Sequence, residues 1–447
     1  MRFAISLSRY SYTNHSFTAD EVTTLSNNRS SNPRVSHETN VFTTIAMALE
    51  SVAIIGAGLG GLSLALFLKQ QGINVTVYEL RKPDVTSAGA IMLSPNALKS
   101  LDAIGAYDRI KDKGYHFRDL TFRNNEHAYL SAYEMGNADK YGYDALRVYR
   151  QVILDELRIM VHEAGIEVAY ETRFAHVVTE TDNKVTFALT DGSQKAADVL
   201  VGADGIHSSV RKYLVQDIKP TFSNVMAVTA AVPTAGIKRP HEPYQMPVSV
   251  HGPAGAFVLA PQNPEGSELL VGIQWRTTER TREEWDALWA DKKQLIGMMR
   301  SNYDTWNPMV QSAMDSVPLH TLSIWPFYTV PKLPTWRSLM GRVVIVGDAA
   351  HAIPPAAGQG VNQAFEDSHS LSLLLKATRN GKIDWSKGLD WWQDYRQGRV
   401  ARVTDLTNEM NKRRLPGWTG ADAQSIDSSW LFGVDIEQDV KSYWQGQ

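Results

Sequence analysis

The sequence predicts an α/β fold in which a parallel sheet is interrupted by a mainly antiparallel β-sheet domain and followed by C-terminal helices. Three observations predict this arrangement. A strand, a glycine-rich turn, a helix and a second strand follow one another over residues 51–79, which is the order of a βαβ unit. Alternating strand patterns fill residues 218–330. A further buried strand, followed by a long helix, begins at Arg342.

Residues 1–48 differ from the rest of the chain in composition. They are rich in Ser, Thr and Asn and show no apolar period. We therefore expect a poorly ordered extension, because such a segment has too little apolar surface to bury. Met47 is an alternative start of the protein, since Met47-Ala48-Leu49-Glu50 leads directly into the first strong strand.

Strand and helix signals continue after the first βαβ unit. The expected elements are helices near 95–113 and 150–164, strands over 166–190 with a hairpin at Asp191-Gly192, a buried strand at 198–201, a Trp-rich amphipathic segment at 281–300 and a long helix from Gly360 to Thr378. These elements divide the chain into an extension (1–48), the first part of a nucleotide-binding domain (49–217), an inserted domain (218–335), the second part (336–380) and a C-terminal helical segment (381–447).

Composition excludes several classes of protein. The chain has no cysteine, which removes disulfides, thiol nucleophiles, iron–sulfur clusters and thiolate zinc sites. Its 45 Lys and Arg residues are balanced by 48 Asp and Glu residues, so it lacks the basic excess that nucleic-acid binding needs. It has no run of about 18 apolar residues for a membrane span and no His/Glu cluster at metal-ligand spacing. We expect a cytoplasmic protein without a metal, a nucleic-acid partner or a membrane partner.

The segment Gly56-Ala57-Gly58-Leu59-Gly60-Gly61 satisfies G-x-G-x-x-G between a strand and a helix. Gly56 permits the tight turn, Gly58 lets the backbone approach a pyrophosphate, and Gly61 lets the helix pack close to the strand. Glu79 ends the second strand 21 residues after Gly58, where a carboxylate can accept hydrogen bonds from ribose hydroxyls. Together these residues predict a Rossmann-like site for an ADP-containing cofactor, without distinguishing NAD from FAD.

Two further motifs follow strands, one running from Val201-Gly202-Ala203-Asp204-Gly205 to Arg211 and the other from Gly347-Asp348-Ala349-Ala350-His351 to Asn362. With these motifs the chain resembles the class A flavoprotein monooxygenases, the aromatic-hydroxylase family typified by 4-hydroxybenzoate and salicylate hydroxylases. The motifs stand in the family's order, and the similarity spans about residues 50–415. The resemblance implies a Rossmann-like FAD-binding domain of the glutathione-reductase or hydroxybenzoate-hydroxylase type, with the inserted sheet as its substrate domain.

The resemblance implies a set of FAD contacts. They are Gly56, Gly58, Gly61, Glu79, Arg81, Arg150, Asp204, Asp348, Gly358, Gly360, Val361 and Asn362. Asp348 is placed to bind a ribityl hydroxyl, and the helix that opens at Gly358-Gln359-Gly360 presents unpaired N–H groups to the pyrimidine edge of the flavin. For Asp204 a turn cap is the alternative to direct contact. For Arg150 the alternative is a surface salt bridge.

The family's chemistry implies an NAD(P)H-dependent monooxygenase. NADPH or NADH would reduce non-covalently bound FAD transiently at the surface, and O2 would then form a flavin C4a-hydroperoxide that hydroxylates an aromatic or polyketide-like small molecule. Two alternatives stay open: an epoxidising or oxidatively decarboxylating monooxygenase of the same family, and a non-catalytic flavin-binding redox sensor. We expect a monomer or a homodimer.

The catalytic residues are less well defined by the sequence. Pro354 stiffens the loop that the family places beside the flavin. His251 lies on a strand of the inserted domain that could form the ceiling over the substrate, as do Gln274 and Trp275, and it is our candidate for the base that deprotonates a phenol. An ordinary core or surface histidine is the alternative.

Overall fold

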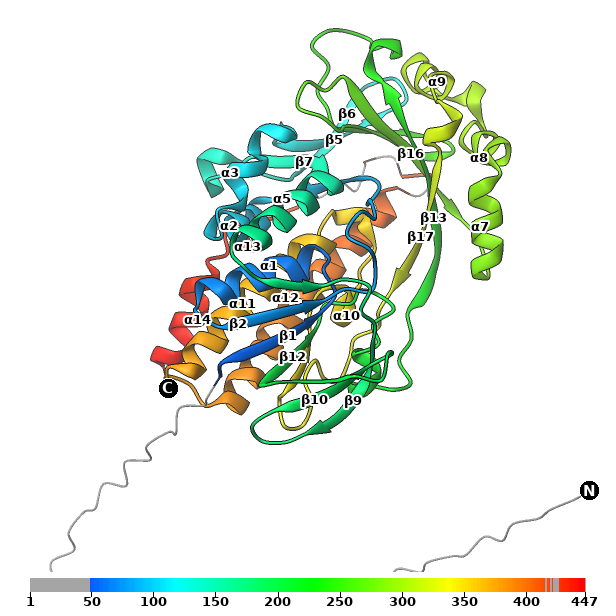
Figure 1. The fold of residues 1–447 in the computed structure, drawn as a ribbon. Coiled ribbons are helices and arrows are strands. Elements are labelled where there is room, and N and C mark those ends of the chain that lie inside the picture. Colours follow the sequence, from blue (N-terminus) through cyan, green and yellow to red (C-terminus); the bar gives the residue numbers. More distant parts are fainter. Residues whose placement is uncertain (1–48, 415, 419, 421–425, 447) are drawn as a thin grey trace, which may run out of the picture. The chain divides into compact units, whose positions relative to one another are not determined.

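A five-stranded parallel sheet forms the centre of the nucleotide-binding domain in the computed structural model, which describes residues 49–446 except 415, 419 and 421–425 (Figure 1). The expected extension and the alternative start at Met47 lie outside the described residues. The strand order is β18 (Val343–Ile345), β12 (Val199–Gly202), β1 (Ser51–Ile55), β2 (Asn74–Tyr78) and β8 (Glu167–Ala169). Strand β12 precedes the inserted domain in the sequence and β18 follows it, and the two pair in parallel. The two parts of the nucleotide-binding domain therefore form one sheet.

Helices and a small antiparallel sheet enclose the parallel sheet. Helix α1 (Leu59–Gln70) contacts α5 (Arg150–Glu163) and α11 (Gly360–Arg379). A three-stranded sheet contributes Phe187, whose ring meets that of Tyr78 edge-to-face at 5.5 Å. Its strands are β9 (Phe174–Glu180), β10 (Val185–Leu189) and β11 (Gln194–Ala197), with the expected hairpin turn at Asp191-Gly192.

A second three-stranded sheet lies beside the first helices. It consists of β3 (Ala90–Leu93), β7 (Ala145–Tyr149) and β4 (Tyr115–Phe117). The helical region expected near 95–113 is present as two α-helices, α2 (Pro95–Ala103) and α3 (Ala106–Ile110), with Gly105 at a φ of 75° between them. Short helices are α4 (Ala138–Tyr141) and α6 (Arg211–Leu214).

A seven-stranded sheet forms the inserted domain. Its order is β17 (Ser323–Thr329), β13 (Thr221–Pro233), β16 (Glu268–Arg276), β15 (Gly255–Pro261), β14 (Val248–Gly252), β5 (Asp119–Asn124) and β6 (Tyr129–Glu134). Among the described strands of this sheet only β14 and β5 pair in parallel. Strands β5 and β6 come from outside residues 218–335, so this sheet uses chain that composition places in the first part of the nucleotide-binding domain.

Helices cover one face of the seven-stranded sheet. They are α7 (Arg282–Ala290), α8 (Lys292–Met299) and α9 (Pro308–Asp315). Trp285 and Leu295 of these helices share an apolar core with Val228 and Ile273 of the strands. The alternation of strand side chains therefore turns the residue after Ile273, Gln274, toward the opposite face.

The chain ends in helices, as expected. They are α10 (Asp348–His351), α12 (Trp385–Arg413), α13 (Ser429–Phe432) and α14 (Ile436–Gln445). Helix α12 packs against α11 and against the loop before it. The α/β fold class, with a parallel sheet, an antiparallel sheet and C-terminal helices, is confirmed. None of the described helices is long and apolar enough to cross a membrane.

Candidate active site

The glycine loop between β1 and α1 is built as the motif predicts. Gly56 has a φ of +108°, and a Cβ there would lie 2.5 Å from the carbonyl oxygen of Ala203. A Cβ on Gly61 would lie 2.0 Å from the carbonyl oxygen of Gly56. A Cβ on Gly58, by contrast, would have no described atom within 4 Å. Gly56 and Gly61 are therefore required by the fold, whereas Gly58 borders open space at the N-terminus of α1, where a phosphate is favoured.

Glu79 connects the end of β2 to this loop. Its Oε2 accepts a hydrogen bond from the backbone N–H of Ala57 at 2.7 Å, and its Oε1 accepts one from the N–H of Arg81 at 2.8 Å. The carboxylate is half-buried. It is thus held beside the glycine loop, with lone pairs left for a ribose hydroxyl.

Three charged residues predicted to contact FAD lie close enough to influence one another. Burial lowers the pKa of Arg150, while the charge of Asp348 raises it and that of Arg81 lowers it. The carboxylate of Asp348 is exposed, and no hydrogen bond joins it to another described residue. These charges are brought together from three distant segments of the chain, and both the FAD contact and the salt bridge considered for Arg150 stay predictions.

Asp204 caps a turn with one oxygen and has a second oxygen without a partner. One oxygen, Oδ2, accepts hydrogen bonds from the backbone N–H groups of Ser209 at 2.7 Å and Val210 at 3.2 Å, which is the turn cap. The other oxygen, Oδ1, is buried and has no hydrogen-bond partner among the described residues. Burial raises the pKa of Asp204. A buried acceptor without a partner is costly, so a ligand donor at Oδ1 would relieve that cost.

The loop before α11 carries the remaining predicted residues. Gly358 takes a φ of +67°, and α11 begins at Gly360, where a Cβ would meet open space. The buried side chain of Asn362 donates to the carbonyl of Met92 at 3.0 Å and accepts from the N–H of Ser94 at 3.1 Å. Asn362 therefore fastens the loop to the end of β3, and only its backbone and that of half-buried Val361 are left to face a cofactor.

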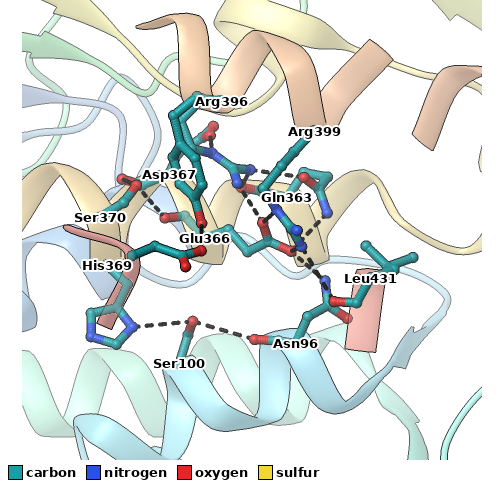
Figure 2. A network of polar contacts seen from close by, with 12 residues as sticks. Asn96, Ser100, Gln363, Glu366, Asp367, His369, Ser370, Arg396, Arg399 and Leu431 are labelled. Atoms are coloured by element: carbon teal, nitrogen blue, oxygen red, sulfur yellow. Dashed lines mark hydrogen bonds and ion pairs between the residues drawn. The ribbon is translucent and has the colours of Figure 1, made fainter. Parts of the chain in front are cut away.

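A buried polar network joins residues of α2, α11 and α12 (Figure 2). Asp367 accepts hydrogen bonds from the N–H of Gly347 at 2.8 Å, from His351 Nε2 at 2.6 Å and from Arg396 Nε at 2.8 Å. Glu366 forms ion pairs with Arg396 and with Arg399. Burial raises the pKa values of both carboxyl groups, but the neighbouring cationic groups outweigh it and hold each at about 2.

This buried network was not predicted from the sequence. Asn96 of α2 donates to Glu366 at 2.6 Å and to Gln359, the residue before α11, at 3.2 Å. Helices α2, α11 and α12 are thereby tied to the loop and, through Gly347, to the chain between the end of β18 at Ile345 and Asp348. The only available signal was the pair of charges Glu366-Asp367 inside an otherwise buried helix, since charged residues are rarely buried without a partner.

His251 lies on β14 in an aromatic and cationic environment. Its ring centroid is 4.6 Å from that of Trp418 and 5.6 Å from that of Phe122. Burial, and then the charges of Arg414 and Arg413, lower its pKa to about 3. The imidazole is neutral at pH 7. It can accept a hydrogen bond there but is a weak proton acceptor, so its role as the base stays a prediction.

A cleft of about 1350 Å³ lies between the seven-stranded sheet, α10 and α12. Its lining includes Asn224, Gln274, Arg276, His351, Pro354 and Lys412. It therefore contains the candidate Pro354 and the expected ceiling residue Gln274, but neither His251 nor Trp275 lines it. Within the described residues no group of three or more His, Cys, Asp or Glu could hold a metal ion.

These residues fit FAD. Three features lie just after the carboxyl ends of neighbouring parallel strands, where this type of sheet binds dinucleotides. They are the open space over Gly58, the buried oxygen of Asp204 that has no described partner, and the exposed carboxylate of Asp348. The individual FAD contacts stay predictions.

Comparison with known proteins agrees with this geometry. Residues 50–407 match the family model described as FAD binding domain. The chain is 27% identical over 392 residues to 6-hydroxynicotinate 3-monooxygenase of Pseudomonas fluorescens, covering 86% of this chain and 95% of the relative. It is 27% identical over 425 residues to a salicylate hydroxylase of Pseudomonas putida, covering 87% and 93%.

Solved structures show the same fold. CtdE in complex with FAD and a substrate matches with a TM-score of 0.73 at 20% identity, covering 89% of this chain and 98% of that one. A salicylate hydroxylase substrate complex matches with a TM-score of 0.72 at 20% identity, covering 88% and 97%. This chain therefore belongs to the FAD-binding domain family and, within it, to the class A flavoprotein monooxygenases.

Proposed function

We propose that this protein is an FAD-dependent monooxygenase that uses NAD(P)H and O2 to hydroxylate an aromatic small molecule. The relatives named above are a hydroxylase and a monooxygenase of aromatic acids. The observation that carries the proposal is that the three separated motifs meet at one edge of the parallel sheet, where Gly58 borders open space, Asp204 keeps an unpaired oxygen and Asp348 is exposed. A protein that used only the first motif would leave the second oxygen of Asp204 and the carboxylate of Asp348 without a partner among the described residues.

The chain's own residues would bind and orient the cofactor. The N-terminus of α1, open over Gly58, would receive the pyrophosphate, and Asp348 would accept a hydrogen bond from the ribityl chain. The N-terminus of α11 at Gly360 would place partial positive charge at the pyrimidine edge of the flavin. FAD, when bound, would supply the redox chemistry and the activation of O2.

Other residues would exclude water and hold the aromatic ring. Pro354 is buried and lacks a backbone N–H, and the methyl groups of Ala356 and Ala357 are buried after it. Phe122 and Trp418 supply aromatic surfaces next to His251. A neutral His251 would accept a hydrogen bond from a substrate hydroxyl and thereby raise the electron density of the ring.

The test is NADH and NADPH oxidation by the purified holoenzyme, measured with and without a panel of phenols and phenolic acids. We expect bound FAD, oxidation that is stimulated by at least one aromatic compound, and a product heavier by one oxygen atom. Hydrogen peroxide in place of product would favour a flavin oxidase-like protein. Protein that retains no FAD after reconstitution would reject the proposal.

A further inference from the structure

Arg147 is a buried cation without a partner among the described residues. It lies in the middle of β7 and is only 5% exposed. Its Nε is buried, and no hydrogen bond or ion pair joins its guanidinium to another described residue. Burial lowers its pKa to about 10, so the group is still charged at pH 7. Arg396, by contrast, is buried against two carboxylates. An unpaired buried charge is unfavourable, and such exceptions are expected at functional sites.

The pairing of β7 with its two neighbours fixes the direction of the Arg147 side chain. Leu146 and Val148, on either side of it, belong to the core of the nucleotide-binding domain. Arg147 therefore points to the opposite face of the strand. Met92 of β3 and Tyr115 of β4 are the residues directly opposite Arg147, so their side chains share its face. Both pack against a different apolar cluster from that of Leu146 and Val148.

This face of the small sheet lies against the loop predicted to hold the flavin ring. A Cβ on Gly358 would lie 3.6 Å from the Cβ of Met92. Asn362, in the first turn of α11, donates to the carbonyl oxygen of Met92 at 3.0 Å. The apolar cluster on this face also includes Ala357, the residue before Gly358. Arg147 is therefore the cation beside the segment that is expected to meet the pyrimidine edge of FAD.

The charge of a flavin changes when it is reduced. Hydride transfer from NAD(P)H brings two electrons and one proton to the oxidised ring, releases NAD(P)+ and leaves the ring with one negative charge. A cation in a site that excludes water attracts this anion more strongly than it attracts the neutral oxidised ring. Charge close to the ring is therefore a means by which a protein sets the reduction potential of its flavin.

We propose that Arg147 faces the ring of bound FAD, stabilises the reduced anionic flavin relative to the oxidised flavin, and so raises the two-electron reduction potential. The N-terminus of α11 supplies only a partial positive charge to this region, whereas Arg147 supplies a whole one. The inference rests on the FAD site of the proposed function and is independent of the identity of the substrate.

The test is the midpoint potential of the FAD-loaded protein at pH 7. Wild type, the neutral variants Arg147→Met and Arg147→Gln, and the charge-conserving Arg147→Lys are reduced with dithionite beside a reference dye, without oxygen, NAD(P)H or substrate. Fluorescence titration of the apoprotein gives the affinity for oxidised FAD. Arg118→Met is the control, because Arg118 follows β4 but is 48% exposed and pairs with Asp139 and Asp144. Its loss tests for a general effect of positive charge.

The shift in potential measures how much more the substitution weakens reduced than oxidised FAD. We expect each neutral variant to weaken reduced FAD about 10- to 100-fold more than oxidised FAD, which lowers the potential by about 30–60 mV. Arg147→Lys should keep the ratio of the two affinities within about threefold of wild type, and Arg118→Met should match wild type. The urea midpoint of the Arg147→Met apoprotein should be unchanged or higher, because an unpaired buried charge is removed.

A purely structural role for Arg147 gives a different result. The inference is overturned if both neutral variants change the ratio of the two affinities by less than about twofold, whether or not they lose stability or oxidised FAD. It is also overturned if Arg118→Met shifts the potential as much as they do. Since the potential is measured without NAD(P)H, oxygen or substrate, a protein that shows the shift but never hydroxylates would reject the proposed function alone.

Discussion

Asp367→Asn tests whether the buried network holds the FAD-binding edge together. The substitution keeps the shape of the side chain but removes its charge and turns one acceptor oxygen into a donor. Arg396 Nε, His351 Nε2 and the Gly347 N–H all point at this carboxylate. The amide can satisfy only part of this set, so at least one donor must face another donor.

The magnitude follows from the complete burial of the pair. Asp367 and Arg396 both have 0% of their side-chain surface exposed, and breaking a buried ion pair by removing one partner costs about 3–5 kcal/mol. Asp390→Asn is the matched control, because Asp390 pairs with Arg337 but is 58% exposed. The same substitution there should cost less than about 1 kcal/mol.

Urea unfolding of the apoprotein, followed by far-UV circular dichroism, measures both free energies. FAD retention, read from the absorbance of the bound flavin, should fall for Asp367→Asn and not for Asp390→Asn. A double-mutant cycle with Arg396→Met should show a coupling of about 1–3 kcal/mol. Asp367→Asn within about 1 kcal/mol of wild type, or a cycle that is additive within about 0.5 kcal/mol, would refute the reasoning.

Three further outcomes are expected. Gly58→Ala should fold normally but bind FAD weakly, because its Cβ would project into the open space where the pyrophosphate is expected. Gly61→Ala should fail to fold stably, because its Cβ would meet a backbone oxygen at 2.0 Å. Circular dichroism and flavin absorbance distinguish the two variants, and equal behaviour would contradict the assigned cradle. Asp348→Ala should lower FAD affinity by about tenfold, against no change in the exposed control Asp286→Ala, as measured by fluorescence titration with FAD. Burial raises the pKa of Glu366, but Arg399 and Arg396 hold it at about 2, below its unfolded value of 4.5, so its stabilisation is present above about pH 5 and is lost as the pH falls toward 2. Urea midpoints measured across this range should fall steeply for wild type and less steeply for Glu366→Gln.

The local features of the fold were predictable. The G-x-G-x-x-G turn requires glycine at Gly56 and Gly61 for reasons contained within a few residues, namely a positive φ and a backbone approach. The strands beside it are short apolar runs that any parallel sheet buries. The long helix expected from Gly360 to Thr378 is confirmed as α11 (Gly360–Arg379).

Pairings between distant segments were not predictable. Strands β5 and β6 join the sheet of the inserted domain because β5 pairs in parallel with β14. The alternation of residues in β5 does not indicate which strand it pairs with. The helical region expected near 95–113 divides at Gly105, where the chain adopts a left-handed conformation. Sequence patterns report which face of an element is buried, but not what covers it.

The sequence by itself determined the fold class, the family and the glycines of the turn between β1 and α1, because these depend on short-range backbone requirements and on spacing along the chain. Only the tertiary structure decided how Glu366 and Asp367 are satisfied, by ion pairs with Arg396 and Arg399. Asn96 and Glu366 are 270 residues apart. The physical reason is that the free energy of a buried charge depends on the groups that folding brings around it.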